Sequence, residues 1–348
     1  MKPLYGIVMA AVPLLFACGA FAAEGVCTTS TQGMFQACKA EVKDDGAEGK
    51  VICNNIADQE EAYGCLTEVV EESQEASKLC KEQAKARAEV CDAIGEDAYD
   101  MSEFWVAENF IDLSDPFEPA SPNPWFNLSV GTTNAFYGEG ETITVVVTAE
   151  TKLIEGVSCR TVNDLVTEDG LDVEDTDDWY AQDIYGNVWY CGEVSLNYEF
   201  YEGDDPEEAE LVDIEGSWKA FRDGAQPGIL LHYDPQVGST YRQEMAWGDA
   251  EDMATVVTVS ADGLLEGDDC GDEDITEAVA EHLAGMCVAE DCLVTLEFTA
   301  LEPEVAEHKY YAPGVGLLLE LEDGECIATQ GVIDEVEDDE EDKEDEDD

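Results

Sequence analysis

Two groups of acidic residues are of the right type to bind a cation, because Ca²⁺ prefers carboxylate and carbonyl oxygens. The first group precedes the tryptophan at position 179 and consists of Asp172, Glu174, Asp175, Asp177 and Asp178. The second surrounds Cys270 and consists of Asp268, Asp269, Asp272, Glu273 and Asp274. Neither follows the spacing of an EF-hand loop. A solvated acidic turn is therefore the favoured interpretation, and calcium binding at the first group is the alternative.

Catalytic motifs are lacking in the sequence. The chain contains three histidines and none of the motifs of serine hydrolases, zinc proteases or nucleotide-binding proteins. Paired carboxylates hydrolyse glycosidic bonds in many enzymes, but 84 acidic residues produce close pairs without any selection for catalysis. We therefore predict no catalytic residue and no cofactor other than calcium.

Aromatic residues are dense in the second half of the chain and often adjacent, as in Trp189-Tyr190. Adjacent side chains of a strand face opposite sides of a sheet, so one set is expected to fill the core and the other to line a groove. Lipid, peptide and sugar are the ligand classes that suit such a groove. The predicted groove residues are Trp179, Trp189, Trp218, Tyr241, His308 and Tyr310. For His308, a strand histidine paired with a carboxylate is the plainer interpretation.

Six cysteines near the N-terminus are spaced as a palindrome. They are Cys27, Cys38, Cys53, Cys65, Cys80 and Cys91, at intervals of 11, 15, 12, 15 and 11 residues. Folding the segment back on itself predicts three nested disulfides, Cys27–Cys91, Cys38–Cys80 and Cys53–Cys65. Residues 24–98 also have a helical composition, so we predict a small disulfide-stapled α-helical hairpin. Two glycines between Asp44 and Gly49 predict a break in its first arm.

The remaining cysteines are predicted to form disulfides as well. Many cysteines with few histidines favour disulfides over zinc, and disulfides favour a compartment outside the cytoplasm. We predict Cys159–Cys191 across the sheet, Cys270–Cys287 within an acidic insert, and Cys292–Cys326 between the last strands. Cys18 is left over and belongs to the export signal.

The pattern of residues 125–333 is that of many short strands separated by turn signals. Helices long enough to cross between parallel strands are not indicated there, so the pairing is expected to be antiparallel. We predict a mainly β fold, a curved antiparallel sheet or half-barrel, with an acidic insert at 262–291. The helical hairpin precedes it, joined through a proline-rich linker at 99–124. Residues 334–348 are predicted to be a disordered acidic tail.

The first 22 residues resemble a signal peptide, with Lys2 before an apolar run too short to span a bilayer. Cleavage after Ala22 would release a secreted protein. Cleavage before Cys18, at a sequence that resembles a lipobox, would instead leave a lipid anchor on that cysteine. The predicted location is therefore extracellular or in the cell envelope, either periplasmic or as an outer-membrane lipoprotein.

The charge is strongly negative, with 84 acidic and 15 basic residues and a formal net charge of −69. Such a chain repels nucleic acid and anionic membranes, so neither is expected as a partner, and no transmembrane segment is predicted. The acids are scattered over the body, which is typical of halophilic adaptation.

The β region resembles an uncharacterised family of bacterial exported proteins and lipoproteins. The matching segments are DWYAQD at 178–183, GNVWY at 186–190, EGSW at 215–218, YRQE at 241–244 and EHKYYAPGVGL at 307–317. The family is similar in pattern to envelope proteins with a half-barrel sheet, and it implies no established activity. Cys159 and Cys191 depart from its pattern.

Three functions remain on sequence grounds. We expect an exported binding or scaffolding module without catalytic activity, whose ligand in the envelope or outside the cell is unknown. The alternatives are a carboxylate-dependent hydrolase acting on saccharide or lipid, and a calcium-binding surface protein.

Overall fold

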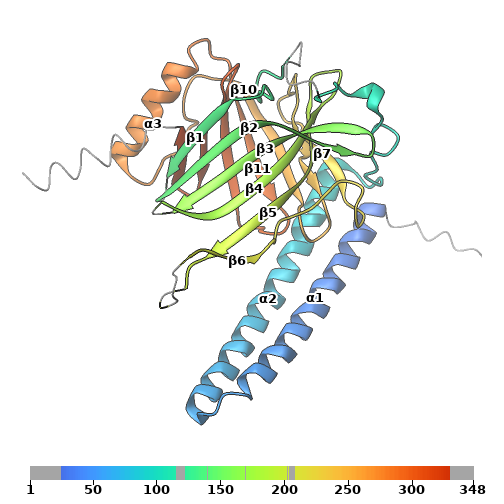
Figure 1. Cartoon of the computed structure of the whole chain (residues 1–348), viewed down its shortest axis with the longest axis vertical. Helices are drawn as coiled ribbons and strands as arrows, with labels where there is room; N and C mark the ends of the chain where they lie inside the picture. The colour runs from blue at the N-terminus through green and yellow to red at the C-terminus, as the bar shows by residue number, and fades with distance from the viewer. Residues whose placement is uncertain are drawn as a thin grey trace, which may run out of the picture.

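The computed structural model of the chain describes residues 25–114, 122–138, 140–168, 170–201, 203 and 208–329. The predicted signal peptide with Cys18, part of the predicted linker and the predicted acidic tail lie outside these residues. Two long helices form a hairpin that projects from a β-barrel (Figure 1).

The hairpin consists of α1 (Val26–Cys53) and α2 (Gln59–Ile94). Disulfides join Cys27 to Cys91, Cys38 to Cys80 and Cys53 to Cys65, which confirms the three nested pairings. Their order follows from antiparallel helices of matched spacing. Asp58 is the N-cap residue of α2, because its carboxylate accepts hydrogen bonds from the amides of Glu60 and Glu61 at 2.8 and 3.1 Å.

The predicted break in the first arm is wrong, since α1 is continuous from residue 26 to 53. The two glycines serve helix packing instead. A Cβ at Gly46 would lie 2.7 Å from the Ser73 hydroxyl, and a Cβ at Gly49 would lie 2.8 Å from a Val69 methyl. Glycine therefore lets α1 approach α2 closely, at a modest cost in helix propensity.

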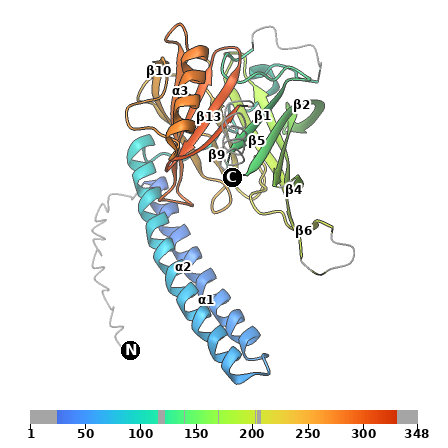
Figure 2. The same ribbon diagram turned by 90° about the vertical axis from the view of Figure 1, so that its left-hand side faces the viewer.

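The rest of the described chain forms an antiparallel sheet of 14 strands that curves into a nearly closed barrel (Figures 1 and 2). The mainly β, antiparallel fold class is confirmed, and the curvature exceeds that of a half-barrel. The strands are β1 (Thr133–Gly138), β2 (Glu141–Ile154), β3 (Val157–Glu168), β4 (Leu171–Gln182), β5 (Val188–Glu199), β6 (Glu210–Asp213), β7 (Gln226–Leu231), β8 (Thr240–Arg242), β9 (Glu244–Met245), β10 (Asp252–Ala261), β11 (Cys292–Thr299), β12 (Ala306–Ala312), β13 (Gly316–Glu322) and β14 (Glu325–Thr329).

One short segment brings the two ends of this sheet together. β8 pairs with β10, and β9 pairs with β7, while β8 and β9 are separated only by Gln243. The backbone of β7 comes very close to this segment: a Cβ at Gly228 would lie 2.1 Å from the Gln243 carbonyl oxygen. Only glycine at position 228 is therefore compatible with this approach.

The acidic insert contains α3 (Glu273–Met286), which packs on the outside of the barrel beside β13 (Figure 2). Val279 and Leu283 of α3 are buried against Leu319 and Tyr310. The insert thus covers apolar surface on the outer face of the last strands, which a single sheet would leave exposed.

The disulfides of the barrel confirm one predicted pairing and correct two. Cys159 is bonded to Cys191, as predicted. The predicted Cys270–Cys287 and Cys292–Cys326 pairings are wrong, because Cys270 is bonded to Cys326 and Cys287 to Cys292. Cys287 directly follows α3, and Cys292 is the first residue of β11. Only 5 residues separate the two cysteines along the sequence, so a short loop brings them together.

The hairpin is attached to the barrel by a buried ion pair. Arg87 of α2 donates two hydrogen bonds of 2.7 Å to the carboxylate of Glu251, and the side chains are only 3% and 2% exposed. Gln83 adds a hydrogen bond of 2.8 Å to the carbonyl oxygen of Leu301. After α2, Trp105 and Phe110 of the predicted linker are buried in the same core as Trp189, so this segment also holds the hairpin in place.

Replacing Arg87 with methionine should lower the free energy of unfolding by about 3–5 kcal/mol, because Glu251 would remain buried without its partner. Lys85→Met is the matched control, since Lys85 forms an exposed ion pair with Glu89, and its loss should cost less than about 1 kcal/mol. Chemical denaturation followed by circular dichroism measures both. Equal, small losses in the two variants would contradict a structural role for the Arg87–Glu251 pair.

Candidate functional site

The barrel encloses a cavity of about 350 Å³ between its two walls. Because side chains alternate along a strand, every second residue points inward. On β3 these are Val162, Asp164 and Val166, and on β4 they include Asp178 and Tyr180. The cavity therefore takes its character from alternate residues of strands that the sheet brings together.

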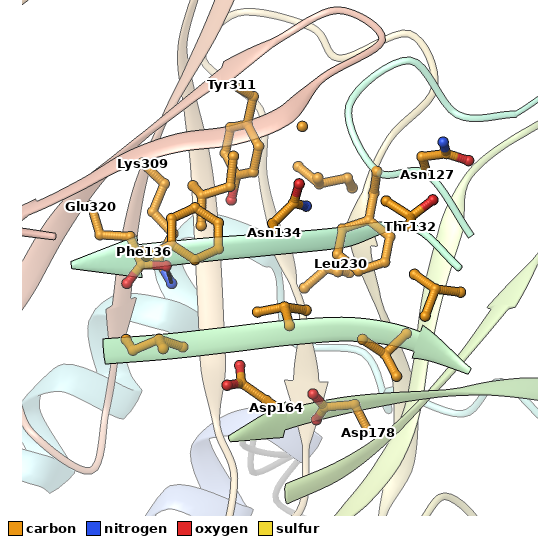
Figure 3. A pocket seen from close by; sticks show the side chains of 18 of the residues that line it. Asn127, Thr132, Asn134, Phe136, Asp164, Asp178, Leu230, Lys309, Tyr311 and Glu320 are labelled. Atoms are coloured by element: carbon orange, nitrogen blue, oxygen red, sulfur yellow. Dashed lines mark ion pairs between the residues drawn. The ribbon is translucent and has the colours of Figure 1, made fainter. Parts of the chain in front are cut away.

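One part of the wall is apolar and another is acidic. The apolar and aromatic lining residues are Phe126, Phe136, Ile143, Val145, Val147, Val162, Val166, Tyr180, Leu230, Leu231, Tyr311, Val315, Leu317 and Ile327. The charged ones are Asp164, Glu174, Asp178, Glu297, Glu320 and Lys309. Figure 3 shows Asp164 and Asp178 on one side of the cavity and Lys309 and Glu320 on another, with Phe136 and Asn134 of β1 between them.

Lys309 of β12 is the single basic residue that lines the cavity. Its ammonium lies 3.1 Å from Glu307, 3.3 Å from Glu320 and 3.7 Å from Glu297. Burial opposes its charge, but Glu320, Glu307 and Glu297 outweigh this and raise the pKa of Lys309 well above its ordinary value. Lys309 is therefore a fixed positive charge, already surrounded by three carboxyls.

Asp178 and Glu193 form a carboxyl pair on the neighbouring strands β4 and β5. The Tyr190 hydroxyl contacts the Asp178 carboxyl and lies 3.0 Å from the Glu193 carboxyl, so the two acids converge on one hydroxyl. Burial is the main cause that raises the pKa of Asp178 to about 8 and that of Glu193 to about 7. Near neutral pH this pair consequently holds a proton between its oxygens.

Two further carboxyls of the barrel interior, those of Asp164 and Glu244, are shifted toward their neutral forms by the same physics. Burial, followed by the charges of Asp178, Glu174 and Glu320, raises the pKa of Asp164 to about 7. Burial, followed by Asp252, Glu193 and Asp178, raises the pKa of Glu244 well above its ordinary value. Carboxyls from different strands thus repel one another across the lumen, and protonation relieves the repulsion.

The structure does not gather the six predicted groove residues around this cavity. Trp179 lies on the outer side with the Lys152 ammonium 3.2 Å from its ring centroid, Trp189 packs on Trp105, and Trp218 is buried against Tyr190. Tyr180, which follows Trp179, and Tyr311, which follows Tyr310, line the lumen instead. The period of two was predicted correctly from the sequence, but the face that lines the cavity was not.

Three of the six lie elsewhere on the barrel. Tyr241 packs edge to face on His232. The His308 imidazole lies 3.0 Å from the carboxylate of Asp268, and the Tyr310 hydroxyl donates to the same carboxylate. The plainer interpretation of His308, a strand histidine paired with a carboxylate, is what the structure shows.

The first acidic group is a strand and not a turn. Residues 172–178 belong to β4, so alternation sends Glu174 and Asp178 into the lumen and Asp175 and Asp177 to the opposite face. On that face the Asn163 amide donates to Asp175 at 2.7 Å. Among the described residues, no group of three or more histidine, cysteine, aspartate or glutamate side chains is placed to hold a metal ion.

Sequence reasoning missed Asp164, Glu193, Glu244, Glu297, Glu320 and Lys309. Carboxyls of a net-acidic chain are expected on the surface, which conceals those that face inward. The available signal was their position in alternating strands, such as Val162-Asn163-Asp164-Leu165-Val166, where one acid falls on an otherwise apolar face.

No family model, curated protein or solved structure matches this chain. No helix among the described residues is long and apolar enough to cross a membrane. The function is therefore inferred from the chemistry of the lumen and of the other cavities.

The lumen carboxyls should make the protein less stable as the pH rises from about 4 to about 8. Asp164 titrates near 7 in the folded state but near 3.8 in a model peptide, so between these values the folded state binds more protons than the unfolded state. The free energy of unfolding then falls with pH, by at most about 1.4 kcal/mol per pH unit for each such group. Denaturant titrations at a series of pH values measure this slope.

Asp164→Asn should flatten that pH dependence, because an amide does not ionise. Asp172→Asn is the control, since Asp172 is exposed at the beginning of β4, and it should leave the slope unchanged. A slope that Asp164→Asn does not alter would mean that Asp164 is ionised in the folded barrel.

Proposed function

We propose that this chain is an exported, non-catalytic binding protein whose barrel lumen holds a small molecule with an apolar body and a cationic group. The observation that carries the proposal is the composition of the cavity, which combines a continuous apolar wall with five carboxyls and a single ammonium. Its volume is at the lower end of the ~300–1,000 Å³ that small-molecule sites occupy.

The charge balance of the lumen selects the sign of the ligand. Lys309 compensates only part of the acidity, because Asp164, Asp178 and Glu193 lie outside its ion pairs. Burial raises the pKa of each of these three carboxyls, so near neutral pH a substantial share of each is protonated. An ammonium bound beside them would stabilise the carboxylates, so cation binding is expected to release protons.

The geometry favours binding over glycoside hydrolysis. A retaining glycosidase holds its two carboxyl groups about 5 Å apart, and an inverting one still farther, so that substrate fits between them. Asp178 and Glu193 instead lie opposite each other on neighbouring strands and converge on the Tyr190 hydroxyl. Two carboxyls that converge on one hydroxyl are not arranged on either side of a substrate.

The six disulfides support folding in an oxidising compartment. We propose that the chain is exported by the signal-like segment 1–22 and acts outside the cell or in the envelope, with a lipid on Cys18 as the anchored variant. The resemblance to bacterial exported proteins and the acidic, salt-adapted composition agree with this location.

Isothermal titration calorimetry with phenethylammonium and its neutral analogue 2-phenylethanol tests the lumen proposal. The cation should bind at least about tenfold more tightly, because a charged hydrogen bond in such a site contributes about 1.5–3 kcal/mol. Titrations at pH 7 in buffers of different ionisation enthalpy should detect proton release. Asp178→Asn should remove most of the preference, whereas the exposed-site control Asp172→Asn should retain it.

Equal binding of the cation and the neutral analogue would contradict the proposed ligand class. Hydrolysis of a saccharide or ester panel that is lost in Asp178→Asn, with the fold intact by circular dichroism, would show that the chain is an enzyme.

A further inference from the structure

A second cavity lies where the helical hairpin meets the barrel. Its volume is about 470 Å³, and it lies outside the lumen. The beginning of α1, the segment that follows α2, and strands β7, β8 and β9 contribute to its wall. Figure 1 shows the ends of both helices against this part of the barrel. The alternation of β7 separates the two cavities, because Ile229 lines this one and Leu230 lines the lumen.

The wall of this cavity is mostly apolar and aromatic. The residues of this kind are Val26, Ile94, Tyr99, Met101, Trp189, Ile229, Tyr241, Met245 and Trp247. The ionisable side chains that line it, apart from tyrosine, are Asp97, His232 and Arg242. Asp97 is exposed at the surface, and burial lowers the pKa of His232, which favours the neutral imidazole. Arg242 is therefore the one permanent charge held within the wall.

Arg242 is buried without a counterion. It is only 6% exposed, and no carboxylate of the described residues lies within 4 Å of its guanidinium. Its Nε has no hydrogen-bond partner there, and one Nη is 3.9 Å from the Met253 sulfur. The rings of Tyr99 and Trp247 have their centroids 5.6 and 5.8 Å from the guanidinium carbon. Aromatic rings thus flank the charge, and the Nε–H group is left without a hydrogen bond.

Glu251, the acid that acts electrostatically on Arg242, already has partners of its own. Glu251 accepts two hydrogen bonds from Arg87 and a third, of 2.8 Å, from the Gly248 amide. Two arginines therefore share one carboxylate, and one positive charge remains. Burial lowers the pKa of Arg242, with Tyr99 and Glu251 acting in the opposite direction.

An uncompensated buried cation is unusual in a chain with 84 acidic and 15 basic residues. Burying a charge is costly unless it is paired, and a carboxylate is the anion whose geometry matches a guanidinium. We propose that this cavity binds a small apolar or aromatic molecule with a single carboxylate, and that Arg242 is the counterion of that carboxylate. The proposal is independent of the lumen, whose preferred ligand has the opposite charge.

Titration calorimetry of the full exported chain with decanoate and decanol tests this site. The wild-type protein should bind decanoate at least about tenfold more tightly than decanol, since the charged contact adds to the apolar one. Arg242→Gln should abolish this preference while leaving decanol binding unchanged. Arg222→Gln is the matched control, because Arg222 is exposed and does not line this cavity, and it should behave as wild type.

A second variant keeps the test decisive if Arg242→Gln fails to fold. Val26 is 52% exposed at the rim of the cavity, so Val26→Trp should narrow the entrance, spare the fold and weaken binding of both probes about tenfold or more. Decanoate binding that is unchanged in Arg242→Gln or in Val26→Trp would overturn the proposal. So would a wild-type protein that binds decanoate no better than decanol, or decanoate binding that is lost in Asp178→Asn, which alters only the lumen.

Discussion

The barrel depends on one constraint, the pairing of a six-residue segment with both ends of the same sheet. Residues 240–242 complete the hydrogen bonding of β10, and residues 244–245 complete that of β7. A nearly closed sheet leaves little exposed edge to aggregate or to admit water along its length. Closure at Gln243 therefore defines an interior and an exterior, and both cavities follow from it.

The same segment supplies an ionisable side chain to each face of the sheet. Arg242 lies in the wall of the outer cavity, whereas Glu244 is electrostatically coupled to the lumen carboxyls Asp178 and Glu193. The interruption of the strand at Gln243 shifts the alternation, so residues two apart no longer share a face. Its neighbour on β7, Gly228, has no side chain to prevent this close approach. The irregularity at Gln243 thus places Arg242 in the wall of the outer cavity and Glu244 near the lumen carboxyls.

Asp164, Asp178 and Glu193 are tolerated in the interior because burial raises their pKa values, which favours their neutral forms. A group of ionised carboxylates in a medium of low dielectric constant would cost several kcal/mol per ion. The disulfides offset part of such a cost by restricting the unfolded chain, and the effect grows with the length of the loop they close. The bonds spanning 64, 56 and 42 residues contribute most in this respect. The six bonds therefore help the protein to tolerate buried carboxyls in its interior.

The sequence predicted what depends on local periodicity. The nested pairs of the hairpin follow from matched cysteine spacing on two antiparallel helices. Positions along the sequence are sufficient to predict such a pairing. The pairing of Cys270 with Cys326 was missed because it depends on a contact between distant turns, where Gly271 lies against Gly324. The glycines at 46 and 49 predict a helix break when only the neighbouring sequence is considered. Their contacts with Ser73 and Val69 of α2 depend on residues that are distant in the sequence.

The inward face of the strands was the hardest feature to predict. In Trp179-Tyr180 the two rings are equally suitable for a core, and the choice is made by the closure of the barrel and by the covering segments at Trp105 and Phe110. The acids on the inward face contradict the usual tendency of charges to face solvent. A functional interior commonly departs from local rules in this way.

The outer cavity also shows why the net charge of −69 does not decide ligand preference by itself. Charges on the surface are screened within about 8 Å at physiological salt, whereas a buried charge acts through a medium of lower dielectric constant. The apolar and aromatic wall around Arg242 strengthens its field inside the cavity and weakens the influence of the acidic surface there. A protein that repels anions over most of its exterior can therefore attract one at this place. The apolar wall and the unpaired arginine are both required for that selectivity, because either one alone would leave the surface potential dominant.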